Sequence, residues 1–395
     1  MTERITDPGE DACMIKRLGA AGLLIILLLS AVTCGLAEKT ILMTFTGDCT
    51  LGSEENNRKK PDSFDSCMEK NGYDYCFANF REMFEQDDLT VVNLEGVLSD
   101  SSYQENKKKP FRFRGPTDFV KILTGSSVEA ACIANNHIMD FGAQGEKSTR
   151  EALEAAGVGW FRNENHYLYK HEGITIAFFA LENSKYYSLR KKLPKIFREL
   201  KETGGVNAIV VCVHTGLEYR GKHDKAAAEM TNNLVNWGAD LVVMHHPHVL
   251  QGMEIINNRN VFYSLGNFVF GGNNSIKTKV YSSMTVTSLY TMVLQVKMTF
   301  SETGTYLGQQ AVIYPAHISS DPQVNYYQPL RLNAEDAVPV REAIQRDTAF
   351  ELPAIEEKDG LSLMEFEYLP APEAAQKTET QEEQTGNMIP VPEEP

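Results

Sequence analysis

Side chains of the types that bind metal ions follow several strand-like runs of this 395-residue sequence. Asp48, Glu95 and His214 each come just after a run rich in Val, Ile and Phe. Loops beyond the carboxyl ends of parallel strands converge on one crevice, so side chains at these positions would meet there. The candidate site residues are Asp48, Glu95, Asn136, His137, His214, His246 and His248.

Each candidate has a purely structural alternative, and the histidine cluster is the strongest signal. Asp48 alone would serve equally well as a turn or helix cap, and His137 alone as a hydrogen-bonded core histidine. Glu95 is harder to explain in this way, because an unpaired carboxylate in apolar surroundings is costly. Three of the nine histidines fall within the single run HHPH. At a strand end, alternate imidazoles such as His246 and His248 would point the same way.

This mixture of carboxylate, amide and imidazole groups predicts a divalent metal site. Such ligands suit Mn, Fe or Zn, and the set is large enough for one or two ions. Two ions bridged by a carboxylate can activate water and hold a phosphoryl group or a similar oxyanion. The sequence has neither a Gly-x-Ser-x-Gly motif nor a P-loop, which argues against serine hydrolases and P-loop ATPases. The net charge of −15 argues against a nucleic-acid binder, whose affinity comes mostly from basic groups.

The elements that must position these side chains are those of a layered α/β domain. Short, continuously apolar runs predict strands that are covered on both faces. The expected strands are residues 41–46, 89–93, 130–134, 174–180, 208–213, 241–244 and 261–264. The expected helices are residues 77–85, 145–156 and 224–237. Asp224 is expected to cap the last helix. The folded domain should span residues 39–321, with residues 322–369 packed on it as an extension.

Both ends of the chain differ from this body in composition. A basic pair precedes an uncharged run from Leu18 to Ala37, which is typical of a secretion signal or a single membrane anchor. We therefore interpret residues 1–37 as a signal peptide or membrane anchor. The protein is expected to be exported, and either anchored at the outer face of the cell membrane or secreted. Acidic residues before Met14 are unusual for a signal, so Met14 is an alternative start. Residues 370–395 are rich in Pro, Glu, Gln and Thr and predict a disordered acidic tail.

The seven cysteines do not form a metal-binding pattern, because no Cys-x-x-Cys occurs. Cys49, Cys132 and Cys212 lie in apolar runs and are expected to be buried free thiols. Cys67 and Cys76 are the one plausible disulfide pair if the chain is exported.

Six ordered motifs resemble those of a known family. They are TFTGDCTLG, VVNLEG, ANNHIMDFGAQG, VHTGLEY, ADLVVMHHPHVLQGME and YSLGNFVFGG, the last of which ends at Gly272. In these motifs the sequence resembles the CapA (PGA_cap) family of poly-γ-glutamate capsule-synthesis proteins, which is similar to the calcineurin-like metallophosphatases. The resemblance implies a four-layer α/β/β/α sandwich around two metal ions, in a protein held at the outer face of the cell membrane.

The resemblance also implies a role for each candidate residue. Asp48 matches the opening metal-binding aspartate, and Glu95 matches the bridging carboxylate. Asn136 matches an asparagine ligand, and His137 matches a histidine that acts as an acid near the leaving group. The other metal ligands that the resemblance implies are His214, His246 and His248. Thr50 stands two residues after the first aspartate, where the related phosphatases usually have a histidine.

Two functions of different classes follow. The first is a metal-dependent hydrolase or transferase of capsule synthesis, which acts on poly-γ-glutamate, its anchor or a phosphorylated intermediate with His137 as general acid. The second is a non-catalytic component of a capsule synthesis and export complex, which binds the polymer or partner membrane proteins. Basic stretches at residues 58–60, 107–114 and 190–192 could bind poly-γ-glutamate or another anionic polymer, or be ordinary solvated loops.

Overall fold

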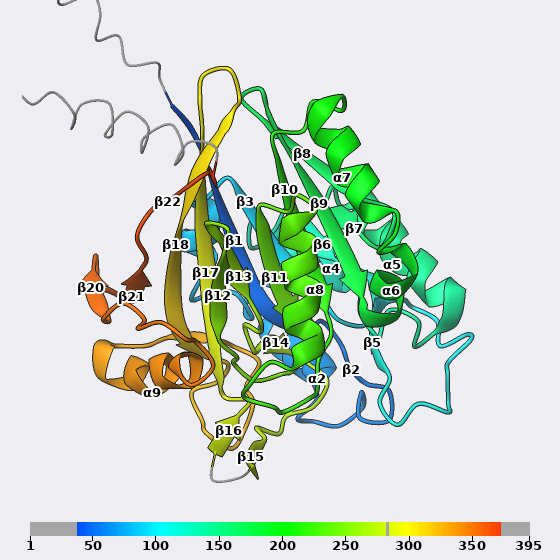
Figure 1. Cartoon of the computed structure of the whole chain (residues 1–395). Coiled ribbons are helices and arrows are strands. Elements are labelled where there is room, and N and C mark those ends of the chain that lie inside the picture. Colours follow the sequence, from blue (N-terminus) through cyan, green and yellow to red (C-terminus); the bar gives the residue numbers. More distant parts are fainter. Residues whose placement is uncertain (1–37, 282–283, 373–395) are drawn as a thin grey trace, which may run out of the picture. The chain divides into compact units, whose positions relative to one another are not determined.

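The computed structural model describes residues 38–281 and 284–372. In this part of the chain two large β-sheets lie face to face, and helices cover the outer face of each (Figure 1). Buried side chains from both sheets form one hydrophobic cluster between them. Two further clusters lie under the helices, one on each outer face. The predicted four-layer α/β/β/α sandwich is therefore confirmed.

The larger sheet has 11 strands among the described residues. Its main path runs through β20 (Glu356–Lys358), β21 (Leu361–Glu365), β18 (Tyr306–His317), β17 (Tyr290–Phe300), β1 (Lys39–Thr50), β3 (Leu89–Leu94), β6 (Ala130–Cys132) and β7 (Gly159–Phe161). Beside this path lie β14 (Asn267–Phe270), which pairs with β1, and β19 (Leu330–Arg331) and β22 (Leu369–Pro370), which pair with β18. β1, β3 and β6 run parallel, so their carboxyl ends lie at the same edge.

The smaller sheet has six strands among the described residues. In spatial order they are β12 (Met253–Ile256), β13 (Arg259–Phe262), β11 (Leu241–His245), β10 (Ala208–His214), β9 (Ile174–Glu182) and β8 (Tyr167–His171). Here β9, β10 and β11 run parallel. Short strands outside the two sheets are β2 (Ser53–Glu54), β4 (Val97–Leu98), β5 (Phe113–Gly115), β15 (Thr278–Tyr281) and β16 (Met284–Thr287).

The helices form the two outer layers. The larger sheet is covered by α2 (Phe64–Asn71), α3 (Arg81–Glu85), the 3₁₀ turn η1 (Thr117–Phe119), α4 (Val120–Thr124) and α5 (Gly142–Ala155). The smaller sheet is covered by α6 (Asn183–Leu189), α7 (Leu193–Glu202) and α8 (Lys225–Asn236). α9 (Ala334–Gln345) buries side chains in the central cluster beside β17 and β18.

Neighbouring residues of the central strands are buried on opposite faces. In β3, Val91 packs between the sheets and Val92 packs under the helices. In β10, Val210 and Val211 divide in the same way. Because both faces need apolar side chains, these strands have continuous apolar sequences rather than alternating ones.

The seven predicted strands are all present and are divided between the two sheets. The predicted cap of α8 is confirmed, since Asp224 accepts a hydrogen bond of 2.8 Å from the Ala227 amide. The predicted helix over residues 77–85 is wrong in its first half. α3 begins only at Arg81, because the Phe77 and Phe80 rings lie in the preceding turns and pack on Phe268.

The long antiparallel pair of β17 and β18 was not predicted. In β18, buried residues alternate with partly exposed ones, and Gly308, Gln309 and Gln310 interrupt its apolar sequence. Because β18 is not a continuous apolar run, its sequence does not match the pattern of a strand covered on both faces.

All five cysteines of the described residues are free. Cys49, Cys132 and Cys212 are buried thiols, as predicted. The predicted pairing of Cys67 with Cys76 is wrong, because Cys76 is buried with its sulfur 3.5 Å from that of Met68.

The two predicted terminal segments lie largely outside the residues that the structure describes. The signal peptide or anchor of residues 1–37, including the alternative start at Met14, lies outside the described residues, as does the acidic tail beyond residue 372. Among the residues that are described, no helix is both long and apolar enough to cross a membrane. Residues 322–369 contribute β19, α9, β20 and β21 beside β18.

A partly buried carboxylate just before β3 predicts a pH-dependent stability. Asp87 Oδ2 accepts a hydrogen bond of 2.7 Å from the Thr90 hydroxyl, whereas Oδ1 is buried without a partner. Burial raises the pKa of Asp87 to about 7. A raised folded-state pKa stabilises the fold below the unfolded-state value of about 4, and that stabilisation is lost as the pH rises through about 7.

We therefore expect Asp87→Asn to raise the free energy of unfolding at pH 8 by about 1–2 kcal/mol and to change it little at pH 4. Thermal unfolding of both proteins at the two pH values measures this difference. Equal shifts at pH 4 and pH 8 would show that the carboxylate charge is not the cause.

Candidate metal centre

The predicted candidates come together at the edge where the parallel strands of both sheets end. Asp48 lies near the end of β1, and Glu95 directly follows β3. Asn136 and His137 follow β6, and His214 is the last residue of β10. The two remaining candidates follow β11 and are His246 and His248. The convergence of strand ends that the sequence predicted is thus present, with the ends supplied by two sheets instead of one.

One group of possible metal ligands consists of Glu95, His214 and His246. Their donor atoms all lie within 4.8 Å of one another. His214 Nε2 is 3.6 Å from Glu95 Oε1 and 3.1 Å from His246 Nδ1. The side-chain oxygen of Asn136 lies 2.9 Å from the same His214 nitrogen. Asn136 therefore adds an oxygen to this group.

A second group consists of Asp48, Glu95 and His248, with the same spacing limit of 4.8 Å. His248 Nδ1 is 3.2 Å from Asp48 Oδ2 and 3.9 Å from Glu95 Oε2. Glu95 thus presents Oε1 to one group and Oε2 to the other. This is the arrangement of a carboxylate that bridges two ions.

The two Glu95 oxygens are the atoms that most need a cation. The side chain is 0% exposed, and neither oxygen accepts a hydrogen bond. Burial raises the pKa of Glu95 to about 8. A buried carboxylate without a hydrogen bond is costly unless a positive charge lies beside it. The residues present therefore fit one or two divalent ions.

The imidazoles of the site differ in charge state. Burial lowers the pKa of His246 to about 4, and it lowers the pKa of His214 well below its usual value. Burial also opposes the charge on His248, but Glu95 and Asp48 outweigh it and raise the pKa of His248 to about 9. Burial alone would raise the pKa of Asp48, yet the hydrogen bond and charge of His248 hold it below its usual value. The neutral His214 and His246 are suited to donate to a metal.

Strand alternation was predicted to point His246 and His248 the same way, and this explanation is wrong. β11 ends at His245, so the alternation of a strand does not extend to these two residues. His246 has φ 103° and His248 has φ 58°, and such values are rare for residues other than glycine. His245 itself points away, and its Nε2 donates to the Thr46 carbonyl at 3.1 Å. The φ of His246 lies outside the left-handed helical region, and such strain is tolerated at functional sites where the surrounding structure holds it.

Asp140, which the sequence did not single out, orients His137. Asp140 Oδ2 accepts hydrogen bonds from His137 Nδ1 at 2.7 Å and from the Phe113 amide at 2.9 Å. The Lys109 ammonium contacts the other oxygen. His137 Nε2 faces the site, 3.8 Å from Glu95 Oε1. Burial lowers the pKa of His137, and the hydrogen bond to Asp140 opposes this shift. Asp140 follows His137 by three residues, and this spacing could have identified it from the sequence.

Two asparagines beside Asp48 were also missed as site residues. Asn93 Nδ2 donates to Asp48 Oδ1 at 2.7 Å, and Asn267 Oδ1 lies 2.9 Å from His248 Nδ1. Both are paired with Asp48 in neighbouring strands. Each is a polar residue in an otherwise apolar strand, and this could have identified both from the sequence. The Thr50 hydroxyl, at the position where a histidine was expected, is buried without a hydrogen-bond partner.

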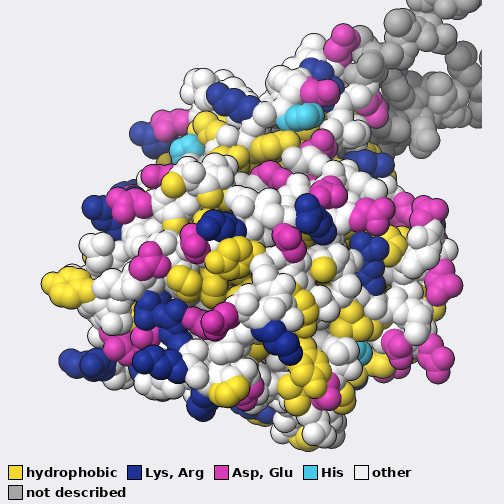
Figure 2. Space-filling model, turned by 180° about the vertical axis from the view of Figure 1, so that it is seen from behind, with side chains coloured by type: hydrophobic (Ala, Val, Ile, Leu, Met, Phe, Trp, Pro, Cys, Tyr) yellow, Lys and Arg dark blue, Asp and Glu magenta, His cyan; other side chains and the backbone are white. Residues whose placement is uncertain are grey.

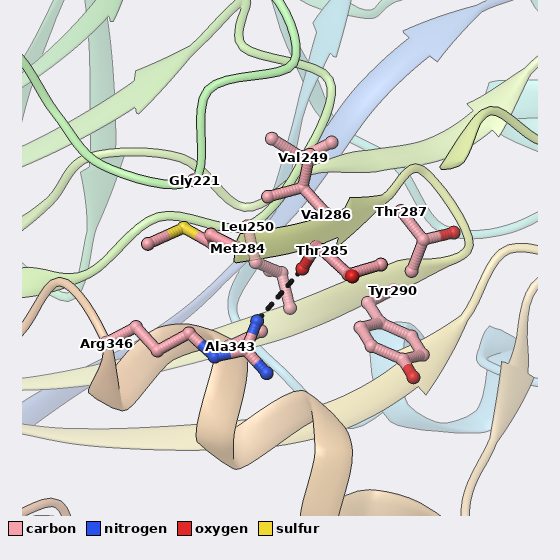
Figure 3. Close-up of a pocket in the computed structure, with 10 residues that line it drawn as sticks. All are labelled: Gly221, Val249, Leu250, Met284, Thr285, Val286, Thr287, Tyr290, Ala343 and Arg346. Atoms are coloured by element: carbon pink, nitrogen blue, oxygen red, sulfur yellow. Dashed lines mark hydrogen bonds between the residues drawn. The ribbon is translucent and has the colours of Figure 1, made fainter. Parts of the chain in front are cut away.

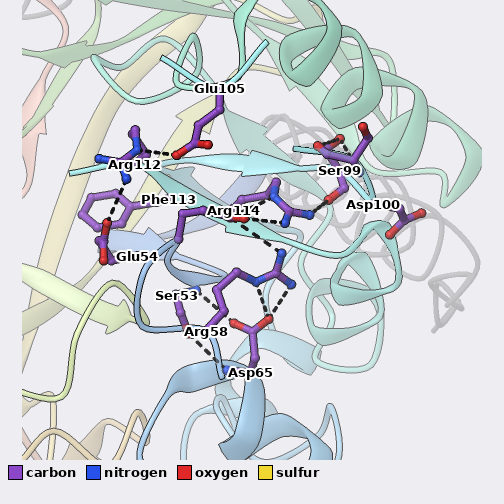
Figure 4. A network of polar contacts seen from close by, with 12 residues as sticks. Ser53, Glu54, Arg58, Asp65, Ser99, Asp100, Glu105, Arg112, Phe113 and Arg114 are labelled. Atoms are coloured by element: carbon purple, nitrogen blue, oxygen red, sulfur yellow. Dashed lines mark hydrogen bonds and ion pairs between the residues drawn. The ribbon is translucent and has the colours of Figure 1, made fainter. Parts of the chain in front are cut away.

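The predicted basic stretches are largely neutralised by acidic neighbours. Arg112 pairs with Glu105 at 2.8 Å (Figure 4), and Arg114 pairs with Glu55 at 2.9 Å. Arg58 is held in the same network. On the face seen in Figure 2, acidic and basic side chains are interspersed. Arg58, Arg112 and Arg114 are therefore paired with carboxylates, whereas Arg190 is exposed and has no ion pair with the described residues, so polyanion binding by these stretches stays a prediction.

Comparisons with known proteins agree on one family. The family model described as "Bacterial capsule synthesis protein PGA_cap" matches residues 42–272, which is more than half of the chain and includes every candidate ligand. The PGA biosynthesis protein CapA of Bacillus subtilis (strain 168) is 28% identical over 273 residues, covering 64% of this chain and 71% of that protein. The capsule biosynthesis protein CapA of Bacillus anthracis is 26% identical over 257 residues, covering 59% of this chain and 60% of that protein.

Among solved structures, a hypothetical protein from Thermus thermophilus matches with a TM-score of 0.40 at 13% identity, covering 70% of this chain and 99% of that chain. A putative 5'-nucleotidase from Staphylococcus aureus matches with a TM-score of 0.38 at 12% identity, covering 78% of this chain and 58% of that chain.

Proposed function

Since the chain belongs to the PGA_cap family of bacterial capsule synthesis proteins, we propose that it acts in poly-γ-glutamate capsule synthesis as a metal-dependent hydrolase or transferase. The observation that carries this proposal is Glu95, a fully buried carboxylate shared by two groups of metal-ligand side chains and hydrogen-bonded to nothing. A site with no catalytic or binding role would gain stability from an apolar residue there.

The ligands of each ion follow from the two groups. Glu95, His214 and His246, with the Asn136 oxygen, would hold one ion. Glu95 would share the second ion with Asp48 and His248. Divalent Mn, Fe or Zn would act here as a Lewis acid that polarises a carbonyl or phosphoryl oxygen.

The protein's own contribution to the chemistry is proton transfer at His137 Nε2. The Asp140 carboxylate accepts the Nδ1 hydrogen, so that the other ring nitrogen faces the site. In its doubly protonated form, which the Asp140 carboxylate stabilises, the ring can give the Nε2 proton to a leaving amine or alkoxide. A cavity of about 270 Å³ opens beside His214 and His246 and is also lined by Glu182 and Ser184. It provides access for the substrate.

The proposed setting is outside the cytoplasmic membrane. Export through residues 1–37, either anchored or cleaved, would bring the site to the growing polymer and to membrane proteins of capsule synthesis and export. The polymer, or its anchor, is the proposed substrate.

The first test is the metal content of the full chain, measured by elemental mass spectrometry. We expect about one to two equivalents of Mn, Fe or Zn per chain. The variant His246→Ala/His248→Ala removes one imidazole from each group and should lose this metal while keeping its circular dichroism spectrum. Metal-loaded protein should then release new amino termini from poly-γ-glutamate, and the variant should not.

A specific observation favours the non-catalytic alternative, a polymer- or partner-binding component of an export complex. Thr50 offers a single hydroxyl where a histidine ligand was expected, so the second group has fewer strong donors. Well-folded chain that binds no metal would contradict the enzyme proposal and support this alternative.

A further inference from the structure

Two lysines without acidic partners stand beside the metal centre. Lys277 and Lys279 belong to the β15–β16 hairpin and the residue before it. Within the described residues, no carboxylate oxygen lies within 4.0 Å of either ammonium group. Neither lysine belongs to the basic stretches noticed in the sequence, because each stands alone between uncharged residues.

The lysines lie on aromatic rings that contact the site. Lys279 Nζ is 4.0 Å from the centre of the Tyr219 ring, and Lys277 Nζ is 5.0 Å from it. The Tyr219 ring lies 5.9 Å from that of His248. Lys277 Nζ is also 5.6 Å from the centre of the Phe111 ring. The two ammonium groups are thus separated from the ligand His248 by a single layer of side chains.

The hairpin is fixed against the body of the protein. Lys279 lies opposite Val286 in the register of β15 and β16. Val286 is buried in a small hydrophobic cluster that includes Tyr219. Figure 3 shows Arg346, at the end of α9, donating to the Thr285 carbonyl, a bond of 3.0 Å. The lysines are therefore held in place by packing and not by a charge partner.

The pair of cations is unfavourable without a ligand. Partial burial and the charge of Lys279 lower the pKa of Lys277, whereas the exposed Glu218 opposes this shift. The charges of the two lysines that lie on Tyr219 repel one another, and the partial burial of Lys277 weakens screening by water. An oxyanion bound to both would relieve the repulsion and gain charge-assisted hydrogen bonds.

We propose that Lys277 and Lys279 form a subsite that holds the free carboxylates of a γ-linked glutamate chain beside the metal centre. This inference rests on the proposed function, since it assigns the polymer to the same site. A γ-linked chain carries one free carboxylate per residue on an aliphatic backbone. The carboxylates would meet the two ammonium groups, and the methylene groups would lie on the exposed Phe111 ring. The neighbouring amide bond would then face the metal ligands.

The test compares poly-γ-glutamate binding by the full chain and by Lys277→Gln/Lys279→Gln, using fluorescence anisotropy of labelled polymer. We expect binding about tenfold weaker in the variant and a shallower dependence on salt, because two charge pairs are lost. The matched control is Lys70→Gln/Lys170→Gln, which removes the same charge from two exposed lysines outside the basic stretches and should bind like the unchanged protein.

Each binding curve is recorded with metal-loaded and with metal-free protein, which separates this inference from the proposed function. Lysine-dependent binding by a protein that holds no metal and cleaves nothing would keep the subsite and contradict the enzyme. Equal binding by the unchanged protein and the Lys277→Gln/Lys279→Gln variant, or no binding by either, would overturn the subsite even if hydrolysis is observed. Tighter binding of inorganic polyphosphate than of poly-γ-glutamate would overturn its assignment to carboxylates.

Discussion

Glu95→Gln should abolish metal binding and at the same time stabilise the metal-free protein. The carboxylate is fully buried and accepts no hydrogen bond, so in the absence of an ion it destabilises the fold. An amide of the same shape removes the charge, and we expect the metal-free variant to gain about 1–3 kcal/mol in free energy of unfolding. Loss of the shared ligand should weaken metal binding by about 100-fold or more, since even residues that only support ligands contribute 10- to 100-fold.

Thermal unfolding with and without EDTA measures both effects in one experiment. The unchanged protein should melt at a higher temperature with metal than without it. A free metal concentration of 100 times the dissociation constant should raise its free energy of unfolding by about 3 kcal/mol. The variant should melt at one temperature under both conditions, above that of the metal-free unchanged protein. Glu302→Gln removes the same charge from an exposed side chain away from the site and should behave like the unchanged protein. A lower melting temperature for metal-free Glu95→Gln would show that the carboxylate has a structural role.

Glu95 is one of several residues at this edge of the sandwich that lower the free energy of unfolding. His246 and His248 adopt positive φ values, and the Thr50 hydroxyl has no hydrogen bond. Residues of this kind persist where binding or catalysis requires them, because the rest of the fold supplies the stability. Here the support comes from β3 and β10, whose side chains are buried on both faces.

The layered fold could be predicted because its central strands are apolar on both faces. Runs such as VVCV in β10 identify a covered strand without knowledge of its partners. β17 and β18 could not be found in this way, since β18 carries Gln309 and Gln310, which bond to the Asp240 carbonyl and to Glu365. Those partners lie far away in the sequence, and only the tertiary structure brings them together.

The same distinction applies to the site. His214 and Glu95 follow apolar strands, so their sequence position reveals them. Asn267 reaches the site only because β14 pairs in parallel with β1, a pairing that no local pattern indicates. His246 and His248 were found by composition, but their direction depends on a backbone turn that strand alternation does not describe. The sequence thus identifies site residues that lie at the ends of regular strands. It does not predict the direction of side chains that lie in irregular loops.

Asp140→Asn should reduce turnover far more than it reduces stability. The carboxylate accepts the His137 Nδ1 hydrogen, and its negative charge stabilises the doubly protonated ring, which carries the Nε2 proton that goes to the leaving group. A neutral amide removes this charge, so the proton-donating form of His137 is less populated. We expect kcat to fall by about 10²- to 10⁴-fold, with unchanged metal content and an altered pH profile.

Lys109→Gln separates this role of Asp140 from a structural one. It removes the ion pair with Asp140 but leaves both the carboxylate and its bond to His137. Both variants lose this partly buried ion pair and should be destabilised by a similar amount, of about 1–3 kcal/mol. Only Asp140→Asn removes the carboxylate charge beside His137, so only that variant should lose most of kcat while KM changes little. If the two variants lose activity in parallel with stability, Asp140 serves the fold alone, and the assignment of proton transfer to His137 loses its support.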